Sequence, residues 1–256
     1  MTHYREPAKT LPVRAFDVVV AGAGTASVVA ALAAARRGAR TALIEIKGYP
    51  GGIVVEGGTA LHSFYNLWKA FPGVEKRQVV RGIPLEIVDR LAAAGGTTGH
   101  VEMTAGYDYD SVCTAIDTEI YKRVAFDMLE EAGVCLCMNT MLCGAIVDKG
   151  RVRGVVAESR SGREAYYGGA FVDCTGYGDL AAHAGATYSE PNDYAVANSI
   201  GVGGVSVEGY HAFIEANGGV SQYSEGPRSG VAGQIVRLSG RLVDMPEGFR
   251  EGARAI

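Results

Sequence analysis

Residues 16–45 hold the pattern that most restricts how this chain can fold. The run FDVVVA at 16–21 is short and continuously apolar, as in a strand that is buried on both faces. An alanine-rich segment at 25–37 predicts a helix that ends at Gly38. The run TALIE at 41–45 predicts the next buried strand. Three elements in about 30 residues fit one right-handed βαβ unit, so we expect an α/β protein with a parallel sheet.

The turn between that first strand and its helix has the sequence GAGTAS and starts at Gly22. Gly22 permits a tight turn, and Gly24 lets the backbone approach a pyrophosphate. The helix N-terminus offers free N–H groups and a partial positive charge to that anion. Glu45 follows Gly22 by 23 residues and would accept hydrogen bonds from adenosine ribose hydroxyls. The pattern predicts a dinucleotide site; the alternative is a glycine turn that binds no nucleotide.

Beyond this unit the chain first continues as α/β and then changes character. The expected elements are a glycine-rich loop at 50–58, a helix at 79–94, a loop at 94–106, a helix at 116–132 and a buried strand at 134–138. Three strands joined by the turn sequences DKG and SG predict an antiparallel meander at 141–147, 152–159 and 163–167. We then expect a buried strand at 169–173 and helices at 178–184, 211–216 and 233–239.

Composition excludes several classes of protein. Glycine makes up 36 of 256 residues, about twice the usual share, which suits tight turns or backbone placed against a ligand. The net charge is −4 and no long basic run is present, so no nucleic-acid partner is expected. Residues 18–35 lack charge, but the glycine turn interrupts them, so they do not predict a membrane span. Residues 1–15 lack a secretory signal and are expected to form a short exposed tail of a cytoplasmic protein.

The five cysteines, most of them in apolar strand-like runs, predict buried reduced thiols and not a disulfide framework. Cys135 and Cys137 leave open one alternative, a redox pair. Side chains two residues apart in a strand point the same way, without the turn of a C-x-x-C site, and this argues against the alternative. No cluster of ligating residues has the spacing of a metal site.

Four stretches together make the chain resemble a known family. They are 17–45, 48–60 (GYPGGIVVEGGTA), the meander with 154–164 (GVVAESRSGRE), and 171–186 (FVDCTGYGDLAAHAGA). Over residues 16–190 the chain resembles the FAD-dependent oxidoreductases of the glutathione-reductase-like flavoproteins. The resemblance implies a Rossmann-like FAD-binding domain at 16–190, with a crossover antiparallel meander and a mainly helical excursion at about 60–112. Residues 191–256 would begin a second, substrate-binding domain.

The resemblance also implies which residues contact FAD. The pyrophosphate would lie against Gly22, Gly24 and the backbone near Thr25 and Ala26, and the adenosine ribose would bind Glu45. Gly51 and Gly52 would lie against the cofactor; the alternative is an ordinary surface loop. The end of the third strand, near Met141 and Leu142, would meet the adenine. A second close approach would come from Thr175, Gly176 and Gly178, with Asp179 nearby, although Asp179 also suits the N-terminus of a helix.

No residue stands out as the catalytic acid or base. His62 follows the glycine loop and could face the flavin, but a single histidine near a loop is more often solvated or hydrogen-bonded. Tyr65, Tyr107 and Tyr109 are aromatic candidates for a substrate pocket. No G-x-S-x-G elbow and no P-loop are present.

Enzymes that this chain resembles are usually longer and carry a C-terminal segment that completes the FAD site. Because the chain ends at Ile256, we expect a fragment of a longer protein, or else a shortened member with impaired flavin binding. The expected activity is hydride transfer between a small-molecule substrate and flavin N5, with an external electron acceptor. The alternatives are a thiazole-synthase-like enzyme on the same fold, a non-catalytic nucleotide-binding remnant, and an NAD dehydrogenase, which the hairpins disfavour.

Overall fold

The chain forms two compact units, one made of residues 1–52 and 125–196 and the other of residues 53–124 and 197–256. The computed structural model describes residues 3, 6–56, 61–66, 68–69, 71–102, 112–189, 206, 209, 212, 216, 220–228 and 231–239. Each unit therefore combines two separate stretches of the sequence. The domain boundaries expected at residues 15 and 190 stay predictions. The excursion expected at 60–112 falls within the second unit.

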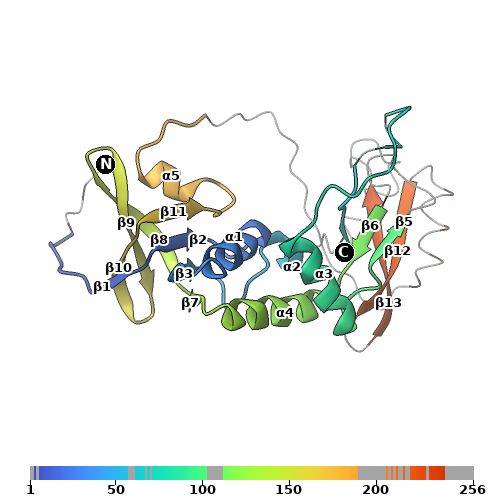
Figure 1. Cartoon of the computed structure of the whole chain (residues 1–256), viewed down its shortest axis with the longest axis horizontal. Coiled ribbons are helices and arrows are strands. Elements are labelled where there is room, and N and C mark those ends of the chain that lie inside the picture. Colours follow the sequence, from blue (N-terminus) through green and yellow to red (C-terminus); the bar gives the residue numbers. More distant parts are fainter. Residues whose placement is uncertain are drawn as a thin grey trace. The chain divides into compact units, whose positions relative to one another are not determined.

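A four-stranded parallel sheet forms the centre of the first unit (Figure 1). Its strands are β2 (Val18–Ala21), β3 (Thr41–Ile44), β7 (Cys135–Cys137) and β11 (Ala170–Asp173), in the spatial order β11-β2-β3-β7. The helix α1 (Thr25–Ala35) connects β2 to β3. The predicted βαβ unit is confirmed, because continuous apolar runs suit strands that are covered on both faces.

The meander forms a second sheet of the first unit. It consists of β8 (Met141–Asp148), β9 (Arg151–Ser159) and β10 (Gly162–Tyr167), which pair antiparallel as predicted. Its fourth strand is β1 (Val13–Ala15), which pairs parallel to β10, with Val13 opposite Ala165. The end of the expected tail is therefore a strand, because the free edge of β10 offers it backbone hydrogen-bond partners.

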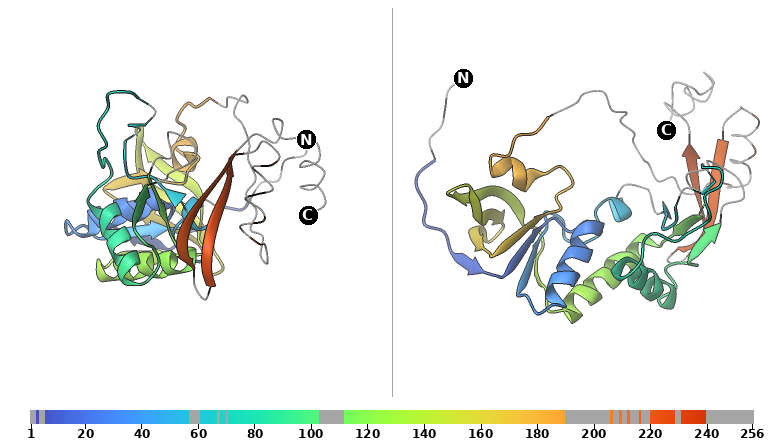
Figure 2. Two further views of the ribbon diagram at one scale, coloured as in Figure 1. Left: turned by 90° about the vertical axis from the view of Figure 1, so that its right-hand side faces the viewer. Right: turned by 45° about the horizontal axis from the view of Figure 1, so that its top comes forward.

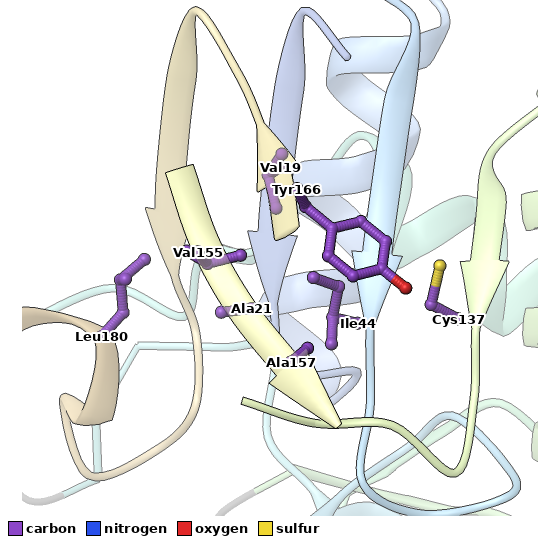
Figure 3. Packing of buried hydrophobic residues seen from close by; sticks show 8 residues of the cluster. All are labelled: Val19, Ala21, Ile44, Cys137, Val155, Ala157, Tyr166 and Leu180. Carbon is purple, nitrogen blue, oxygen red and sulfur yellow. The ribbon is translucent and has the colours of Figure 1, made fainter. Parts of the chain in front are cut away.

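The two sheets pack against each other around a buried core (Figure 3). Val19 and Ala21 of β2 face Val155 and Ala157 of β9, together with the Tyr166 ring of β10. Because strand residues alternate between faces, the other face of the parallel sheet is covered separately, and α1 packs on β2 and β3 there. Figures 1 and 2 show this order of layers, with α1 and the meander on opposite sides of the sheet.

Two further helices lie in the described residues, and the first begins at a capping residue. In α4 (Thr118–Glu131), the Asp117 carboxylate accepts hydrogen bonds from the backbone N–H groups of Glu119 and Ile120, at 2.9 and 3.0 Å. These bonds satisfy donors that a helix start leaves without partners. The short helix α5 (Asp179–His183) follows β11, and Leu180 adds to the core between the sheets.

The second unit is less helical than the sequence predicted. It contains α2 (Ile53–Glu56), α3 (Ile83–Ala93) and a three-stranded antiparallel sheet of β4 (Leu61–His62), β5 (His100–Glu102) and β6 (Val112–Ala115). The expected excursion therefore contains strands as well as a helix, and the loop expected at 94–106 contains the strand β5. The strands β12 (Val220–Arg228) and β13 (Val231–Ser239) form a hairpin, so the helix expected at 233–239 is wrong. Residues 231–239 pair with β12 at nine positions, and this pairing favours a strand over the weak helical pattern of the sequence.

Three expectations from the sequence concern membrane spans, cysteines and metal ligands. Among the described residues, no helix is both long and apolar enough to cross a membrane. The five cysteines are free thiols, as predicted, but Cys113 and Cys137 are buried whereas Cys135, Cys143 and Cys174 are half-buried. No group of three metal-ligating side chains occurs in the described part of the chain.

Candidate cofactor site

Gly22 is required by the fold itself. Its backbone has φ +93°, a conformation that residues with a side chain rarely adopt. A Cβ atom at this position would lie 2.4 Å from the carbonyl oxygen of Cys174, at the end of the neighbouring strand β11. The glycine therefore lets the turn after β2 pass close to the turn after β11. This brings two of the predicted cofactor-binding segments together.

Gly24 has a different environment. It is the N-cap of α1 with φ −67°, and a Cβ atom here would meet nothing within 4 Å. No side chain caps the helix, and its first turn contains no acidic residue. The backbone N–H groups of Thr25 and Ala26 thus begin a helix that has neither a side-chain cap nor an acidic residue in its own first turn. Open space in front of an uncapped helix start fits a pyrophosphate.

Glu45 connects the ends of β2 and β3. One carboxylate oxygen accepts a hydrogen bond from the Ala23 N–H at 2.6 Å, and the other accepts from the Lys47 N–H at 2.8 Å. A carboxylate has about four acceptor positions, so two remain for ribose hydroxyls. Because Ala23 lies between the two glycines of the turn, Glu45 also holds that turn in place.

Gly51 and Gly52 pack on the Gly24 turn. The Gly51 N–H donates to the Ala23 carbonyl at 2.7 Å, and Gly51 forms a parallel bridge with Gly24. Gly52 has φ +53°, and a Cβ atom there would lie 2.9 Å from the Gly24 Cα. Backbone packing between two loops thus accounts for these glycines in the structure. Their contact with a cofactor stays a prediction.

The predicted adenine region lies beside Glu45. The Thr140 N–H donates to the Glu45 carbonyl at 2.8 Å and thereby brings the start of β8 next to the end of β3. The side chains of Ile46 and Met141 are each 54% exposed there. Leu142, in contrast, packs against the core between the two sheets. Exposed apolar side chains next to the Glu45 carboxylate suit a flat apolar base, and Met141 is therefore the better placed of the two predicted residues.

The segment after β11 forms a loop held by Asp173. Its carboxylate accepts hydrogen bonds from the Thr175 N–H and hydroxyl, at 3.1 and 2.8 Å, and from the Ala181 N–H at 2.9 Å. Partial burial opposes ionisation, but these hydrogen bonds hold the pKa of Asp173 below its usual value. The Thr175 hydroxyl in turn accepts from the Asp179 N–H at 2.9 Å. Thr175 is thus engaged within the loop.

The remaining predicted residues of this loop face open space. Gly176 and Gly178 have φ +91° and +75°, and a Cβ atom at either would meet nothing within 4 Å. Asp179 is exposed in the first turn of α5, and Tyr177 is 94% exposed. The site therefore collects at the carboxyl ends of β2, β3 and β11, where ligands bind in open α/β sheets.

The histidine and tyrosine candidates belong to the second unit. His62 pairs with Thr114 in the β4–β6 ladder, and Thr114 also pairs with His100 of β5. Tyr65 contacts His100 edge-on, with ring centroids 5.7 Å apart. Tyr107 and Tyr109 lie outside the described residues.

His100 is a residue that the sequence reasoning missed. Its Nδ1 lies 2.6 Å from the Thr114 hydroxyl, and the Phe64 ring centroid lies 4.9 Å from its own. Its Nε2 is buried and is the single such side-chain nitrogen or oxygen without a hydrogen-bond partner among the described residues. Burial lowers the pKa of His100, and Asp89 opposes that effect. A lone histidine in HVE carries no local signal, so only the sheet pairing could have revealed it.

Comparison with known proteins gives one family match and several similar solved structures. The model of the family described as FAD dependent oxidoreductase matches residues 17–221. No curated protein matches the chain. Among solved structures, a geranylgeranyl bacteriochlorophyll reductase-like protein from Thermoplasma acidophilum is 18% identical, covering 68% of this chain and 42% of that one, with a TM-score of 0.45. THI4 from Thermovibrio ammonificans is 16% identical, covering 66% and 61%, with a TM-score of 0.45.

L-proline dehydrogenase from P. horikoshii is also similar, at 14% identity, covering 71% of this chain and 58% of that one, with a TM-score of 0.45. The chain thus spans less than two thirds of the length of these structures. The family model covers most of the sequence, including the Gly22 turn, Glu45 and the Asp173 loop. The chain belongs to the FAD dependent oxidoreductase family.

Proposed function

We propose that the first unit binds FAD and that the chain is the FAD-binding part of an oxidoreductase. The observation that carries this proposal is the uncapped start of α1, with open space at Gly24 and the Glu45 carboxylate bound to the same turn. Membership of an FAD-dependent family supports it. The alternatives of a thiazole-synthase-like enzyme and a non-catalytic remnant use the same nucleotide site and differ in what the site holds or does.

Each residue of the site has one task in this proposal. The Thr25 and Ala26 N–H groups would bind the pyrophosphate, and Glu45 would accept from the ribose hydroxyls. Met141 would lie along the adenine, and the open backbone at Gly176 and Gly178 would permit a second close approach. When bound, FAD supplies hydride transfer at its N5 atom, which the protein side chains cannot provide. The substrate is a small organic molecule, with an external acceptor completing turnover.

The remaining candidates for proton chemistry are the histidines of the second unit. His62 and His100 flank Thr114 in one row of the β4–β6–β5 sheet. His100 is held through Nδ1 by the Thr114 hydroxyl, and its lowered pKa keeps it neutral at pH 7. A neutral imidazole can accept a proton. Because the Nε2 atom of His100 is buried and its Nδ1 is engaged by Thr114, this ring is not placed to act on a substrate, and we assign no general base.

The test compares FAD with FMN, which lacks the adenosine. Glu45→Gln keeps the size of the side chain and one carbonyl acceptor, but it removes the charge and part of the accepting capacity. Because a hydrogen bond to a charged group contributes about 1.5–3 kcal/mol, we expect FAD affinity to fall about tenfold or more. FMN affinity should not change. Flavin fluorescence quenching measures both affinities.

A matched control is Glu130→Gln, which alters an exposed carboxylate on α4. It should leave both affinities unchanged. If Glu45→Gln binds FAD as the unaltered chain does, Glu45 does not bind the ribose. If the folded chain takes up no flavin at all, the proposal in its present form is wrong for this chain, and the non-catalytic remnant is favoured.

A further inference from the structure

Arg14 forms an unusual contact with two cysteines in the first unit. It lies on β1, and its guanidinium approaches two sulfurs on β7, with Nη2 2.8 Å from the Cys135 Sγ and Nη1 3.4 Å from the Cys137 Sγ. Both cysteines are free thiols. The two-pronged geometry is the one with which arginine usually binds the two oxygens of a carboxylate. Here two sulfurs occupy the positions of those oxygens.

Aromatic rings hold the guanidinium in this position. The Arg14 Cζ lies 5.4 Å from the Phe16 ring centroid and 5.5 Å from the Tyr166 ring centroid. The Tyr166 hydroxyl points toward Cys137 (Figure 3) and donates to a Glu164 carboxylate oxygen at 2.8 Å. A guanidinium stays protonated at any pH that a folded protein meets, so the positive charge of Arg14 is permanent.

The charges at this contact do not balance. A guanidinium can only donate, so both sulfurs must accept, and a neutral thiol is a weak acceptor. The Cys137 thiol is buried and the Cys135 thiol is half-buried. A permanent cation thus faces sulfurs that form a strong, charge-assisted pair only when they lose protons.

Geometry decides what could join the two sulfurs. Residues two apart in a strand have Cα atoms about 6.6–6.8 Å apart, at the upper limit for a disulfide. A metal ion between two thiolates spans about 4.6 Å, taking roughly 2.3 Å per metal–sulfur bond, whereas an S–S bond spans about 2 Å. The longer bridge suits this pair without bending β7. Cys135 is half-buried and gives access from solvent.

We propose that Cys135 and Cys137 bind one thiophilic monovalent cation of the Cu(I) class as a two-coordinate bis-thiolate, with Arg14 as its counter-ion. Both thiols release a proton when the ion binds. One monovalent ion and two thiolates carry a net charge of −1, which the guanidinium neutralises. Soft thiolates select ions of this class.

The same charge balance disfavours divalent ions. A bis-thiolate of Zn²⁺ would be neutral and would gain nothing from Arg14. Zinc sites also need four ligands as a rule, and no group of three His, Cys, Asp or Glu side chains occurs among the described residues. The charge of the ion and the number of ligands therefore both favour a monovalent ion of the Cu(I) class over Zn²⁺ at this site.

The experiment measures Cu(I) affinity of the reduced full chain under anaerobic conditions, by competition with a chromogenic Cu(I) chelator. We expect one ion per chain. Cys135→Ser and Cys137→Ser should each weaken binding at least 100-fold. Arg14→Met keeps an apolar stem against the aromatic rings and should weaken binding about tenfold, as loss of an outer-shell partner does. Arg14→Lys, which keeps the charge, should lose less than Arg14→Met.

Cys143→Ser is the matched control, because Cys143 is also half-buried and lies on β8 of the same unit. It should bind Cu(I) like the unaltered chain. The melting temperature without metal shows whether each variant folds, and size-exclusion chromatography shows whether the ion bridges two chains. Equal affinity in the unaltered chain and either Cys135→Ser or Cys137→Ser would overturn the proposal. So would an unchanged affinity in Arg14→Met, tighter binding of Zn²⁺ than of Cu(I), or an ion shared between two chains.

Discussion

Gly22 and Gly24 belong to the same turn, but replacing each by alanine should affect a different property: Gly22→Ala the stability of the fold, and Gly24→Ala the affinity for FAD. In Gly22→Ala, the new Cβ would lie 2.4 Å from the Cys174 carbonyl oxygen, and the residue would keep φ +93°. Backbone strain of this kind costs about 1–3 kcal/mol, and a clash with backbone that cannot rotate away costs about 1–3 kcal/mol more. The total of roughly 2–6 kcal/mol is a large part of a typical stability of about 5–15 kcal/mol.

Gly24→Ala should leave the fold nearly intact. The new Cβ meets nothing within 4 Å, and φ −67° suits any residue. The expected loss is at most about 1 kcal/mol, since alanine is a poorer N-cap than glycine. The methyl group would, however, occupy the space through which a pyrophosphate approaches the helix start. We therefore expect FAD affinity to fall at least tenfold.

The assay pairs urea unfolding with FAD titration on both variants. The reasoning predicts that stability and affinity separate, with Gly22→Ala losing stability and Gly24→Ala losing affinity. It is refuted if Gly22→Ala unfolds within about 1 kcal/mol of the unaltered chain. It is equally refuted if Gly24→Ala is stable and binds FAD with unchanged affinity.

Two further predictions concern pH. Hydrogen bonds hold the pKa of Asp173 below its usual value, so its contribution to stability is present at neutral pH and is lost as the pH falls through that lowered pKa. Asp173→Asn should lower the free energy of unfolding by about 1–3 kcal/mol at pH 7. Urea unfolding should show that this difference between variant and unaltered chain shrinks from pH 7 to pH 3. A difference that stays constant over this range would contradict the prediction. Burial lowers the pKa of His100. An NMR titration of its ring should therefore have its midpoint below the unperturbed value of about 6.5. A midpoint above that value would show that the ring is not buried as described.

Local signals explain why the βαβ unit and the meander could be predicted. Apolar runs, a glycine turn and a helix stop agree with one another along 16–45, and β2, α1 and β3 lie within those limits. The turn sequences DKG and SG set the hairpins of the meander, where Lys149 and Gly150 both have positive φ. Such features depend on neighbours in sequence, which a single chain reveals.

Features that depend on distant pairing could not be predicted in this way. The glycine motif gives Gly22 and Gly24 similar tasks, and only the position of Cys174 separates them. Likewise, Arg14 meets Cys135 across 121 positions, because β1 pairs with β10 and the meander packs on the sheet that contains β7. The hairpin of β12 and β13 is different, because its strands are near neighbours in sequence; it was missed because Gly226 and Pro227 in β12 argue against a strand.

The position of β2 between β3 and β11 has a consequence for synthesis of the chain. Val18 pairs with Ala170, 152 positions later, so one edge of β2 stays open while most of the protein is still being made. β3 ends at Ile44 and β11 starts at Ala170; at about 5–20 residues per second, this interval lasts roughly 6–25 s. An apolar strand with a free edge can pair with another chain during that time. Ribosome-bound chains that stop before β11 should therefore be the aggregation-prone stage of biosynthesis, and the arrival of residues 170–173 ends it.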